Sequence, residues 1–152
     1  MRTHFTIKTH SGHETMHLGL FLGREIRNYR AGAGFSLTIL LSGGLGAGKT
    51  VFAKGVGKGL GVKPTIHSPT FLLMKRYPLA RSCFKNLWHI DCYRIHNARE
   101  LVALGLKDIL RDSTNVVVIE WPERVRKLIP RGALTVSFAH TIGDTRIIRF
   151  QS

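Results

Sequence analysis

A glycine-rich loop in the first third of the chain limits the possible folds more than any other feature. Residues 43–50 run Gly-Gly-Leu-Gly-Ala-Gly-Lys-Thr, which matches the phosphate-binding loop pattern of spaced glycines followed by lysine and threonine. Such a loop joins a buried strand to a helix N-terminus, where backbone N–H groups and the helix dipole favour bound phosphate. The sequence therefore predicts an α/β fold that binds a nucleoside triphosphate with Mg²⁺.

Each residue type in the loop suits one task in triphosphate binding. Glycines at Gly43, Gly46 and Gly48 let the backbone turn closely around phosphate oxygens. Lys49 is expected to reach the β- and γ-phosphates, and the Thr50 hydroxyl is expected to be a ligand of Mg²⁺. The alternative is a flexible glycine loop with an incidental lysine, and the apolar strand predicted just before the loop argues against it.

Strands and helices alternate on both sides of the loop. A helix is expected after the glycine-rich loop, although Gly55, Gly57 and Gly59 each destabilise a helix by about 1 kcal/mol relative to alanine. The alternation predicts one P-loop NTPase domain over residues 1–152, with a mostly parallel sheet flanked by helices and a C-terminal hairpin. The expected strands are 5–7, 35–41, 70–76, 87–92, 116–119, 134–138 and 146–150, and the expected helices are 14–29, 50–60 and 97–104.

The composition is that of a globular protein in the cytoplasm. Hydrophobic residues make up 43% of the 152 residues, and no apolar run approaches the roughly 20 residues that would span a bilayer. The first residues show no secretory signal. Cys83 and Cys92 lack the spacing of a zinc site or a redox pair, so both are expected to be reduced thiols.

The net charge is unusually high. The chain has 23 Lys and Arg against 9 Asp and Glu, a formal charge of +14. This excess suggests contact with a polyanion such as RNA, or with an acidic protein surface. The basic residues are spread along the chain, so a solvated surface that serves only solubility is the equal alternative.

Two acidic residues follow apolar strands and are candidates for the reaction centre. Asp91 follows the run 87–90, and Glu120 follows the run 116–119. Ligands of parallel sheets bind at the carboxyl ends of the strands, which places both carboxylates near the loop. Either could hold Mg²⁺, directly or through water, and either could orient or deprotonate an attacking water.

The nucleotide is expected to be ATP. The guanine-binding pattern of Asn or Thr, Lys, any residue and Asp is absent, because Lys107 and Asp108 are adjacent. No residue can be assigned to the adenine from the sequence alone.

Four sequence blocks follow one another along the chain: residues 43–50, then 68–71 (Ser-Pro-Thr-Phe), 89–94 (His-Ile-Asp-Cys-Tyr-Arg) and 119–123 (Ile-Glu-Trp-Pro-Glu). Together they resemble the TsaE family, formerly YjeE, of small bacterial P-loop ATPases, and the resemblance covers nearly the whole chain. It implies an ATPase required to form N6-threonylcarbamoyladenosine at position 37 of tRNAs that read codons beginning with A. It further implies work inside a complex with the threonylcarbamoyl transferase TsaD and its paralogue TsaB, with tRNA as a further component.

The resemblance also implies roles for individual residues. Thr70 belongs to a loop that senses the nucleotide, Asp91 helps to bind Mg²⁺, and Glu120 with Trp121 serves activity. Trp121 could instead be a core residue that covers the sheet edge. The catalytic set is Lys49, Thr70, Asp91 and Glu120, the metal set is Thr50, Asp91 and Glu120, and the nucleotide-binding set is Gly44, Leu45, Gly46, Ala47, Gly48, Lys49, Thr50, Val51 and Trp121.

Other positions match the family or depart from it. Arg94 could stabilise phosphate charge or brace its loop, and Thr15 could lie near the base or cap the first helix. Gly44 stands where the family commonly has an acidic residue, and Val51 replaces a frequent threonine.

Two other functions remain as alternatives. A small-molecule kinase would need a lid, for which Arg124-Val125-Arg126-Lys127 followed by Arg131 is the candidate, although a basic helix face also explains that cluster. The second alternative is a nucleotide-dependent module that binds tRNA and hydrolyses ATP slowly.

Overall fold

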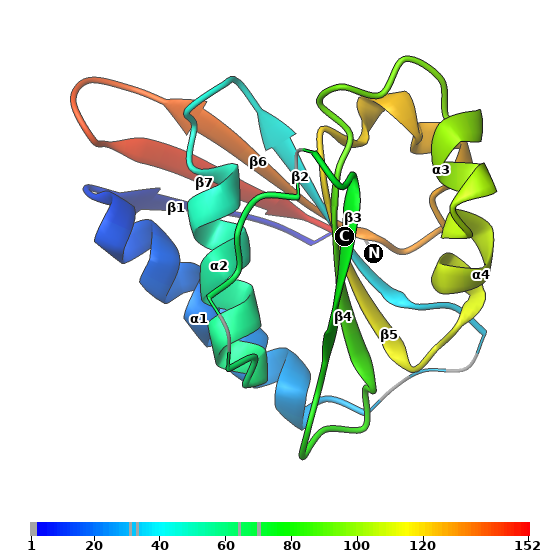
Figure 1. Ribbon diagram of the computed structural model, residues 1–152. Coiled ribbons are helices and arrows are strands. Elements are labelled where there is room, and N and C mark those ends of the chain that lie inside the picture. Colours follow the sequence, from blue (N-terminus) through cyan, green and yellow to red (C-terminus); the bar gives the residue numbers. More distant parts are fainter. Residues whose placement is uncertain (1–2, 31, 33, 64, 70) are drawn as a thin grey trace.

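A seven-stranded sheet with helices on both faces forms the centre of the computed structural model, which describes residues 3–30, 32, 34–63, 65–69 and 71–152 (Figure 1). The strand order is β1-β7-β6-β2-β5-β4-β3. The strands are β1 (His4–Thr9), β2 (Leu37–Gly43), β3 (Met74–Pro78), β4 (Asn86–Asp91), β5 (Asn115–Glu120), β6 (Leu134–His140) and β7 (Arg146–Gln151). The α-helices are α1 (Gly12–Asn28), α2 (Lys49–Leu60), α3 (Arg99–Ala103) and α4 (Leu106–Arg111), and two 3₁₀ turns, η1 (Pro122–Arg124) and η2 (Arg126–Leu128), follow β5.

The parallel pairing predicted from the sequence occupies the middle of the sheet. β2 pairs in parallel with β5 and with β6, and β4 pairs in parallel with β5. Both edges are antiparallel, through the β3–β4 pair on one side and the β6–β7 and β1–β7 pairs on the other. The α/β domain and its C-terminal hairpin, β6–β7, are therefore confirmed, with a mixed rather than largely parallel sheet.

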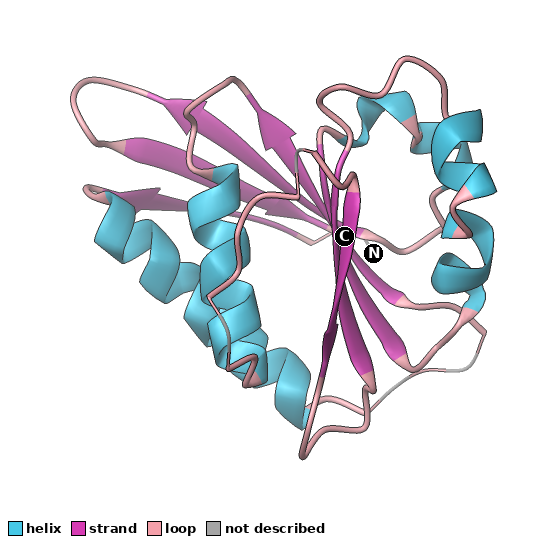
Figure 2. Cartoon of the chain, viewed as in Figure 1, coloured by secondary structure: helices cyan, strands magenta, loops and turns pink. Residues whose placement is uncertain are grey.

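Helices cover each face of the sheet (Figure 2). A separate cluster of apolar side chains lies on each face. On β5, Val116 and Val118 belong to the cluster under α1 and α2, whereas Val117 and Ile119 belong to the cluster under α3 and α4. All six residues of β5 are buried. A strand covered on both faces needs apolar residues at every position, which explains the unbroken Val-Val-Val-Ile run.

Glycines bring α1 and α2 into backbone contact. A Cβ on Gly19 of α1 would overlap the Phe52 carbonyl oxygen, and a Cβ on Gly55 of α2 would overlap the Met16 carbonyl oxygen. Gly23 and Gly59, each four residues further along, make the same kind of approach. The weak helix propensity of α2 is thus the cost of close packing against α1.

Some predicted boundaries differ from the structure. The strand predicted from residue 70 begins at Met74, because the N–H groups of Leu72 and Leu73 donate to the Pro69 carbonyl and Leu73 has a positive φ of 63°. Because of this turn, the strand starts four residues later than predicted. The helix α4 was not predicted, although Leu106, Ile109 and Leu110 are its buried face.

Thr70, a predicted catalytic residue, lies outside the described residues. Among the described helices, none combines the length and apolar character that crossing a membrane requires. Both cysteines are free thiols, with Cys83 exposed and Cys92 buried.

Candidate active site

The glycine-rich loop borders a cavity of about 350 Å³ at the carboxyl end of β2. The helix α2 starts at Lys49, and its N-cap Gly48 has a φ of 105°, a conformation that other residues rarely adopt. Ten of the residues predicted from the sequence line this cavity: Leu45, Gly46, Ala47, Gly48, Lys49, Thr50, Val51, Asp91, Glu120 and Trp121. Gly44 is exposed and is not among the lining residues.

The Lys49 side chain folds back and contacts the backbone of the glycine-rich loop. Its Nζ donates to the carbonyl oxygens of Gly43, at 2.7 Å, and Gly44, at 2.6 Å. The side chain is buried, and this burial lowers the pKa of the Lys49 ammonium, while the nearby carboxylates of Glu120, Asp91 and Glu123 act in the opposite direction. A buried cation held only by neutral carbonyl groups would gain from an anionic partner.

Glu120 lies at the end of β5, next to Asp91 at the end of β4. The register pairs the two residues because β4 and β5 are parallel and end at the same edge. Glu120 is 2% exposed, and its two oxygens have different partners. Its Oε2 accepts a hydrogen bond from the Thr50 hydroxyl at 3.0 Å, and its Oε1 lies 3.1 Å from Nε2 of His89.

Asp91 is held by hydrogen bonds from two different segments of the chain. Its Oδ2 accepts a hydrogen bond from the Ser68 hydroxyl at 3.0 Å, and its Oδ1 accepts one from the Tyr93 backbone N–H at 2.9 Å. Both Ser68 and Tyr93 also line the cavity. The two carboxylates lie together at one sheet edge, as predicted, whereas the contacts from Ser68 and His89 were not predicted.

Trp121 covers one side of the cavity in a strained backbone conformation. Its φ of 55° lies in the left-handed region, which is unusual for a bulky residue. Its ring lies over the Lys49 ammonium, with the Nζ 4.1 Å from the ring centroid, and next to the Tyr93 ring at 5.1 Å. The indole therefore belongs to the cavity wall, although it also packs against the apolar cluster under α3 and α4.

Arg146 is a cavity residue that the sequence analysis missed. It opens β7 and is 9% exposed, and its side chain packs on Gly48, where a Cβ would lie 2.9 Å from its Nε. One nitrogen, Nη1, donates to the Asp144 carbonyl at 2.7 Å, whereas the buried Nε has no hydrogen-bond partner among the described residues. Only the strand order, which puts β7 two strands from β2, brings this arginine to the loop.

Thr15 also lies beside Gly48. Its methyl group would be 3.5 Å from a Cβ on Gly48, and its hydroxyl is 2.8 Å from the Thr9 hydroxyl. The helix cap is Ser11, whose side chain accepts from the Glu14 N–H. Thr15 is therefore not the capping residue.

Arg94 lies away from the cavity lining. Its guanidinium carbon is 4.8 Å from the centroid of the Phe71 ring, and the side chain is exposed. This contact fits the loop-bracing role, one of the two roles considered for Arg94.

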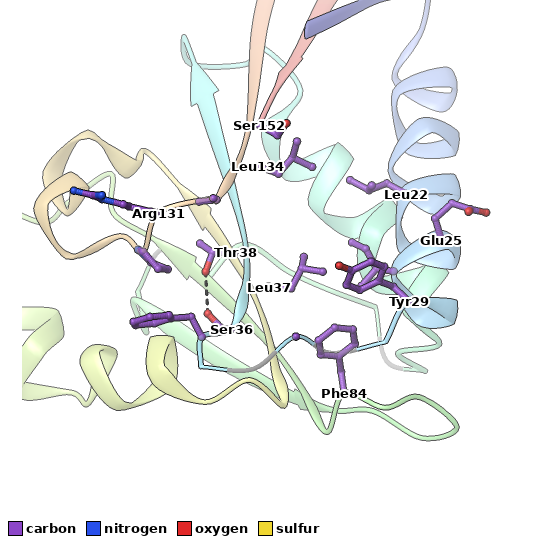
Figure 3. Close-up of a pocket in the computed structure, with 16 residues that line it drawn as sticks. Leu22, Glu25, Tyr29, Ser36, Leu37, Thr38, Phe84, Arg131, Leu134 and Ser152 are labelled. Carbon is purple, nitrogen blue, oxygen red and sulfur yellow. Dashed lines mark hydrogen bonds between the residues drawn. The ribbon is translucent and has the colours of Figure 1, made fainter. Parts of the chain in front are cut away.

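The basic cluster considered as a kinase lid does not reach this cavity. Arg124 and Lys127 lie on the 3₁₀ turns η1 and η2, and neither lines it. Arg131 belongs to a second cavity, of about 600 Å³, at the opposite end of β2 (Figure 3). Leu37 and Phe84 contribute to the apolar wall of that cavity, which shares no residue with the first one.

The donor set around the first cavity suits a hydrated divalent cation bound with phosphates. Thr50 offers a hydroxyl oxygen, and Asp91 and Glu120 offer carboxylates. The described residues contain no group of three or more His, Cys, Asp or Glu that could hold a metal ion. Mg²⁺ does not need one, because it usually keeps waters and takes one or two carboxylates together with substrate phosphates.

Comparisons with known proteins identify the family of this chain. The family model described as "Threonylcarbamoyl adenosine biosynthesis protein TsaE" matches residues 9–148. A curated protein of Treponema pallidum, named tRNA threonylcarbamoyladenosine biosynthesis protein TsaE, is 34% identical over 127 residues, which cover 84% of this chain and 85% of that protein. The protein of the same name from Nostoc is 39% identical over 114 residues, covering 73% of this chain and 64% of the relative.

A solved structure has the same fold. The crystal structure of Bacillus subtilis YdiB superposes with a TM-score of 0.75 and 26% identity, covering 100% of this chain and 87% of that one. The family model spans the loop, both carboxylates and Arg146, and the solved structure matches the whole sheet. The chain belongs to the TsaE family.

Proposed function

We propose that this protein binds ATP with Mg²⁺ and hydrolyses the ATP as a component of the machinery that forms N6-threonylcarbamoyladenosine at position 37 of tRNAs reading codons that begin with A. The observation that carries the proposal is the single cavity in which Lys49, Thr50, Asp91 and Glu120 meet. Membership of the TsaE family, whose description names threonylcarbamoyl adenosine biosynthesis, supports the tRNA part of the proposal.

Lys49 would bind the β- and γ-phosphates in place of its present partners. It now donates to the neutral carbonyl oxygens of Gly43 and Gly44. Phosphate oxygens accept hydrogen bonds from a buried ammonium more strongly than carbonyl oxygens do, because both partners are charged. The N-terminus of α2, a helix of 12 residues, adds a favourable dipole for the same phosphates.

Thr50 and Asp91 would hold Mg²⁺, which would supply positive charge to neutralise the triphosphate. Glu120 would orient the attacking water and accept its proton. Its Oε2 already faces the loop through the hydrogen bond from Thr50. This division of tasks fits Asp91 as well, because hydrogen bonds from Ser68 and the Tyr93 N–H hold its carboxylate in place.

Arg146 would bind the nucleoside end of ATP. The strand order β7-β6-β2-β5 puts it on the side of the loop opposite to Glu120. If the γ-phosphate lies near Glu120, the α-phosphate and the ribose lie near Arg146. A guanidinium has only N–H donors, and its unpartnered Nε suits a phosphate or ribose oxygen.

Hydrolysis would drive a conformational change in partner proteins, with no phosphoryl group passed to a metabolite. The expected partners are a threonylcarbamoyl transferase like TsaD and its paralogue like TsaB. The basic residues that were the candidate lid of a kinase, Arg124, Arg126, Lys127 and Arg131, do not line this cavity. The described residues therefore give no support to the kinase alternative.

The test is a measurement of phosphate release from ATP by the protein alone, with the two partners, and with a panel of nucleosides and small acids. We expect slow release alone and faster release in the complex, with both rates lowered by about 100-fold or more in Glu120→Gln. Phosphorylation of a metabolite without the partners would refute the proposal, as would full turnover in Glu120→Gln.

Direct contact with tRNA is a second candidate function, favoured by the charge distribution. Within the described part of the chain the two ion pairs each join a histidine to a glutamate, so no lysine or arginine there forms a salt bridge. Three basic residues, Lys107, Arg111 and Lys127, line one hollow of about 210 Å³ with no acidic residue among its lining. Phosphate groups of RNA fit such a surface.

A salt titration of tRNA binding tests this second candidate. If the hollow binds phosphates, affinity should fall as salt rises, and each lost contact should lower the slope of log affinity against log salt by about 0.7 to 0.9. Lys107→Gln with Lys127→Gln should reduce the slope, whereas Lys58→Gln on α2, which does not line the hollow, should not. A slope near zero for the intact chain would exclude the contact.

A further inference from the structure

His89 is a fully buried histidine that the proposed mechanism does not use. It lies on β4 and is 1% exposed. Its Nε2 is 3.1 Å from Oε1 of Glu120, a buried residue on the neighbouring strand. A histidine in the apolar interior needs a reason, because burying a polar ring is unfavourable unless its nitrogens are hydrogen-bonded.

The pairing of β4 with β5 explains why the side chains of His89 and Glu120 meet. In the β4–β5 register His89 is opposite Val118, and Glu120 is two residues beyond Val118. Residues two apart in a strand project from the same face, so His89 and Glu120 lie diagonally on one face, the face covered by α2. Asp91, two residues after His89, projects from that face as well.

The hydrogen-bond pattern assigns the ring proton to Nε2. Nδ1 of His89 is buried and has no partner among the described residues. A proton on Nδ1 would leave a buried donor unsatisfied and would turn the lone pair of Nε2 towards a carboxylate oxygen. With the proton on Nε2, the ring donates to Glu120 Oε1.

Glu120 is therefore held on both oxygens. His89 holds Oε1 from the sheet, and Thr50 holds Oε2 from the loop. The Thr50 contact comes from a residue that the proposed function also assigns to Mg²⁺, so it belongs to the part of the site that changes with the nucleotide. His89 lies on the buried strand β4, at a position that nucleotide binding and release do not involve.

We propose that His89 is a positioning residue, whose Nε2–H fixes the Glu120 carboxylate so that Oε2 faces Thr50 and the attacking water. This inference rests on the proposed function, because it assigns Glu120 to ATP hydrolysis. His89 touches neither the nucleotide nor the water. Its effect is therefore on the rate of hydrolysis and not on nucleotide affinity.

The first test separates turnover from binding. His89→Leu removes the donor and is expected to lower kcat by about 10- to 100-fold, by analogy with the loss of a hydrogen-bond partner behind a metal ligand, with the ATP dissociation constant unchanged within about twofold. His89→Gln places an amide N–H near the position of Nε2 and should restore most of the rate. His96→Gln, an exposed histidine that does not line the cavity, is the matched control and should leave both quantities unchanged.

A second set of variants covers the case in which His89→Leu does not fold. His89→Asn keeps a polar side chain but is too short to reach Glu120, so it should lose as much turnover as His89→Leu. In a Glu120→Gln background, His89→Asn should cause no further loss beyond about twofold, because residues that act as one unit are not additive. Equal losses in the two backgrounds would overturn the proposal.

A third test does not depend on turnover. In nitrogen-15 spectra of histidine-labelled protein without nucleotide, the resonances missing in His89→Gln identify His89, and we expect a proton on Nε2 and none on Nδ1. A proton on Nδ1 alone would refute the inference, as would wild-type turnover in His89→Leu or equal losses in the Gln and Leu variants. A wild-type protein that does not hydrolyse ATP even with its partners would instead refute the proposed function, and the inference with it.

Discussion

The Lys49 ammonium lies 2.6 Å from the carbonyl oxygen of Gly44, so the loop binds its own lysine. The same Nζ also donates to Gly43 and lies against the Trp121 ring. These neutral groups hold the cation where an anionic phosphate would be a stronger partner. A phosphate that took the place of the two carbonyl oxygens would therefore exchange two neutral partners of the lysine for a charged one.

Replacing Lys49 tests this arrangement. We expect Lys49→Ala to weaken ATP binding at least about tenfold, because a buried charged hydrogen bond typically contributes 1.5–3 kcal/mol. Isothermal titration calorimetry would measure the loss. The control Lys58→Ala changes an exposed lysine on the same helix and should bind ATP like the unaltered protein. Unchanged affinity in Lys49→Ala would contradict the role of the lysine.

The two carboxylates should affect turnover more than binding. Asp91→Asn keeps an oxygen that can accept from Ser68 but removes the negative charge from the cavity that it lines with Thr50, and Glu120→Gln removes the proposed proton acceptor. We expect both variants to lower kcat by about 100-fold or more, with ATP affinity changed by less than about threefold. Phosphate release and calorimetry together would separate the two effects. A fall in affinity that matches the fall in kcat would show that these residues serve binding.

Much of this site could be predicted from local sequence. The loop is contiguous, and Asp91 and Glu120 each end a buried apolar run, so the rule for parallel sheets brings them to one edge. The α/β class follows from the same alternation of strands and helices.

The missed residues depend on long-range geometry. His89 meets Glu120 only through the β4–β5 register, and Arg146 meets Gly48 only because β7 lies beside β6. Neither the register nor the strand order can be read from the spacing of apolar residues. The error at β3 was local, because the turn at Pro69 overrides the apolar pattern of residues 71–73.

Arg146 should contribute to binding of the nucleoside end. We expect Arg146→Met to weaken ATP and ADP binding equally, by about tenfold, through loss of one charged hydrogen bond. Inorganic tripolyphosphate, which has the phosphates but no nucleoside, should lose affinity as ATP does if Arg146 binds the α-phosphate, and should bind both proteins alike if Arg146 binds the ribose. Arg149→Met on the same strand changes an exposed residue that does not line the cavity, and it is the control. A larger loss for ATP than for ADP would instead put Arg146 near the γ-phosphate.

The glycines between α1 and α2 should be sensitive to a single added methyl group. Although alanine favours a helix by about 1 kcal/mol, we expect Gly55→Ala to destabilise the protein by about 2 kcal/mol or more, because its Cβ would overlap the Met16 carbonyl oxygen. Thermal unfolding should show a melting temperature lower by about 4–8 °C.

The matched control is Gly12→Ala, at the start of α1. A Cβ there meets nothing within 4 Å, so this variant should be as stable as the original protein or slightly more stable. Equal stability of Gly55→Ala and Gly12→Ala would show that the two helices can separate without cost.

The two thiols should differ in reactivity. Burial raises the pKa of Cys92 to about 12, and the nearby carboxylates of Asp91, Glu123 and Glu120 act in the same direction. The folded protein therefore holds the Cys92 proton more tightly than the unfolded chain, so the stability from this group is present below about pH 9 and is lost as the pH rises towards 12. Mass spectrometry after iodoacetamide at pH 8 should find Cys83 modified and Cys92 unmodified, and denaturant should expose both. Rapid modification of Cys92 in the folded protein would contradict its burial.

The backbone contact between α1 and α2 couples the movements of the two helices. No side chain separates Gly19 from the Phe52 carbonyl group, or Gly55 from the Met16 carbonyl group. The two helices therefore have little freedom to slide past each other. A nucleotide that shifts the start of α2 would carry α1 along with it. The helix α1 follows the edge strand β1 closely, and Thr15 of α1 is hydrogen-bonded to Thr9 at the end of that strand. The occupancy of the loop could thus be sensed at the far edge of the sheet, by a partner that never touches the nucleotide.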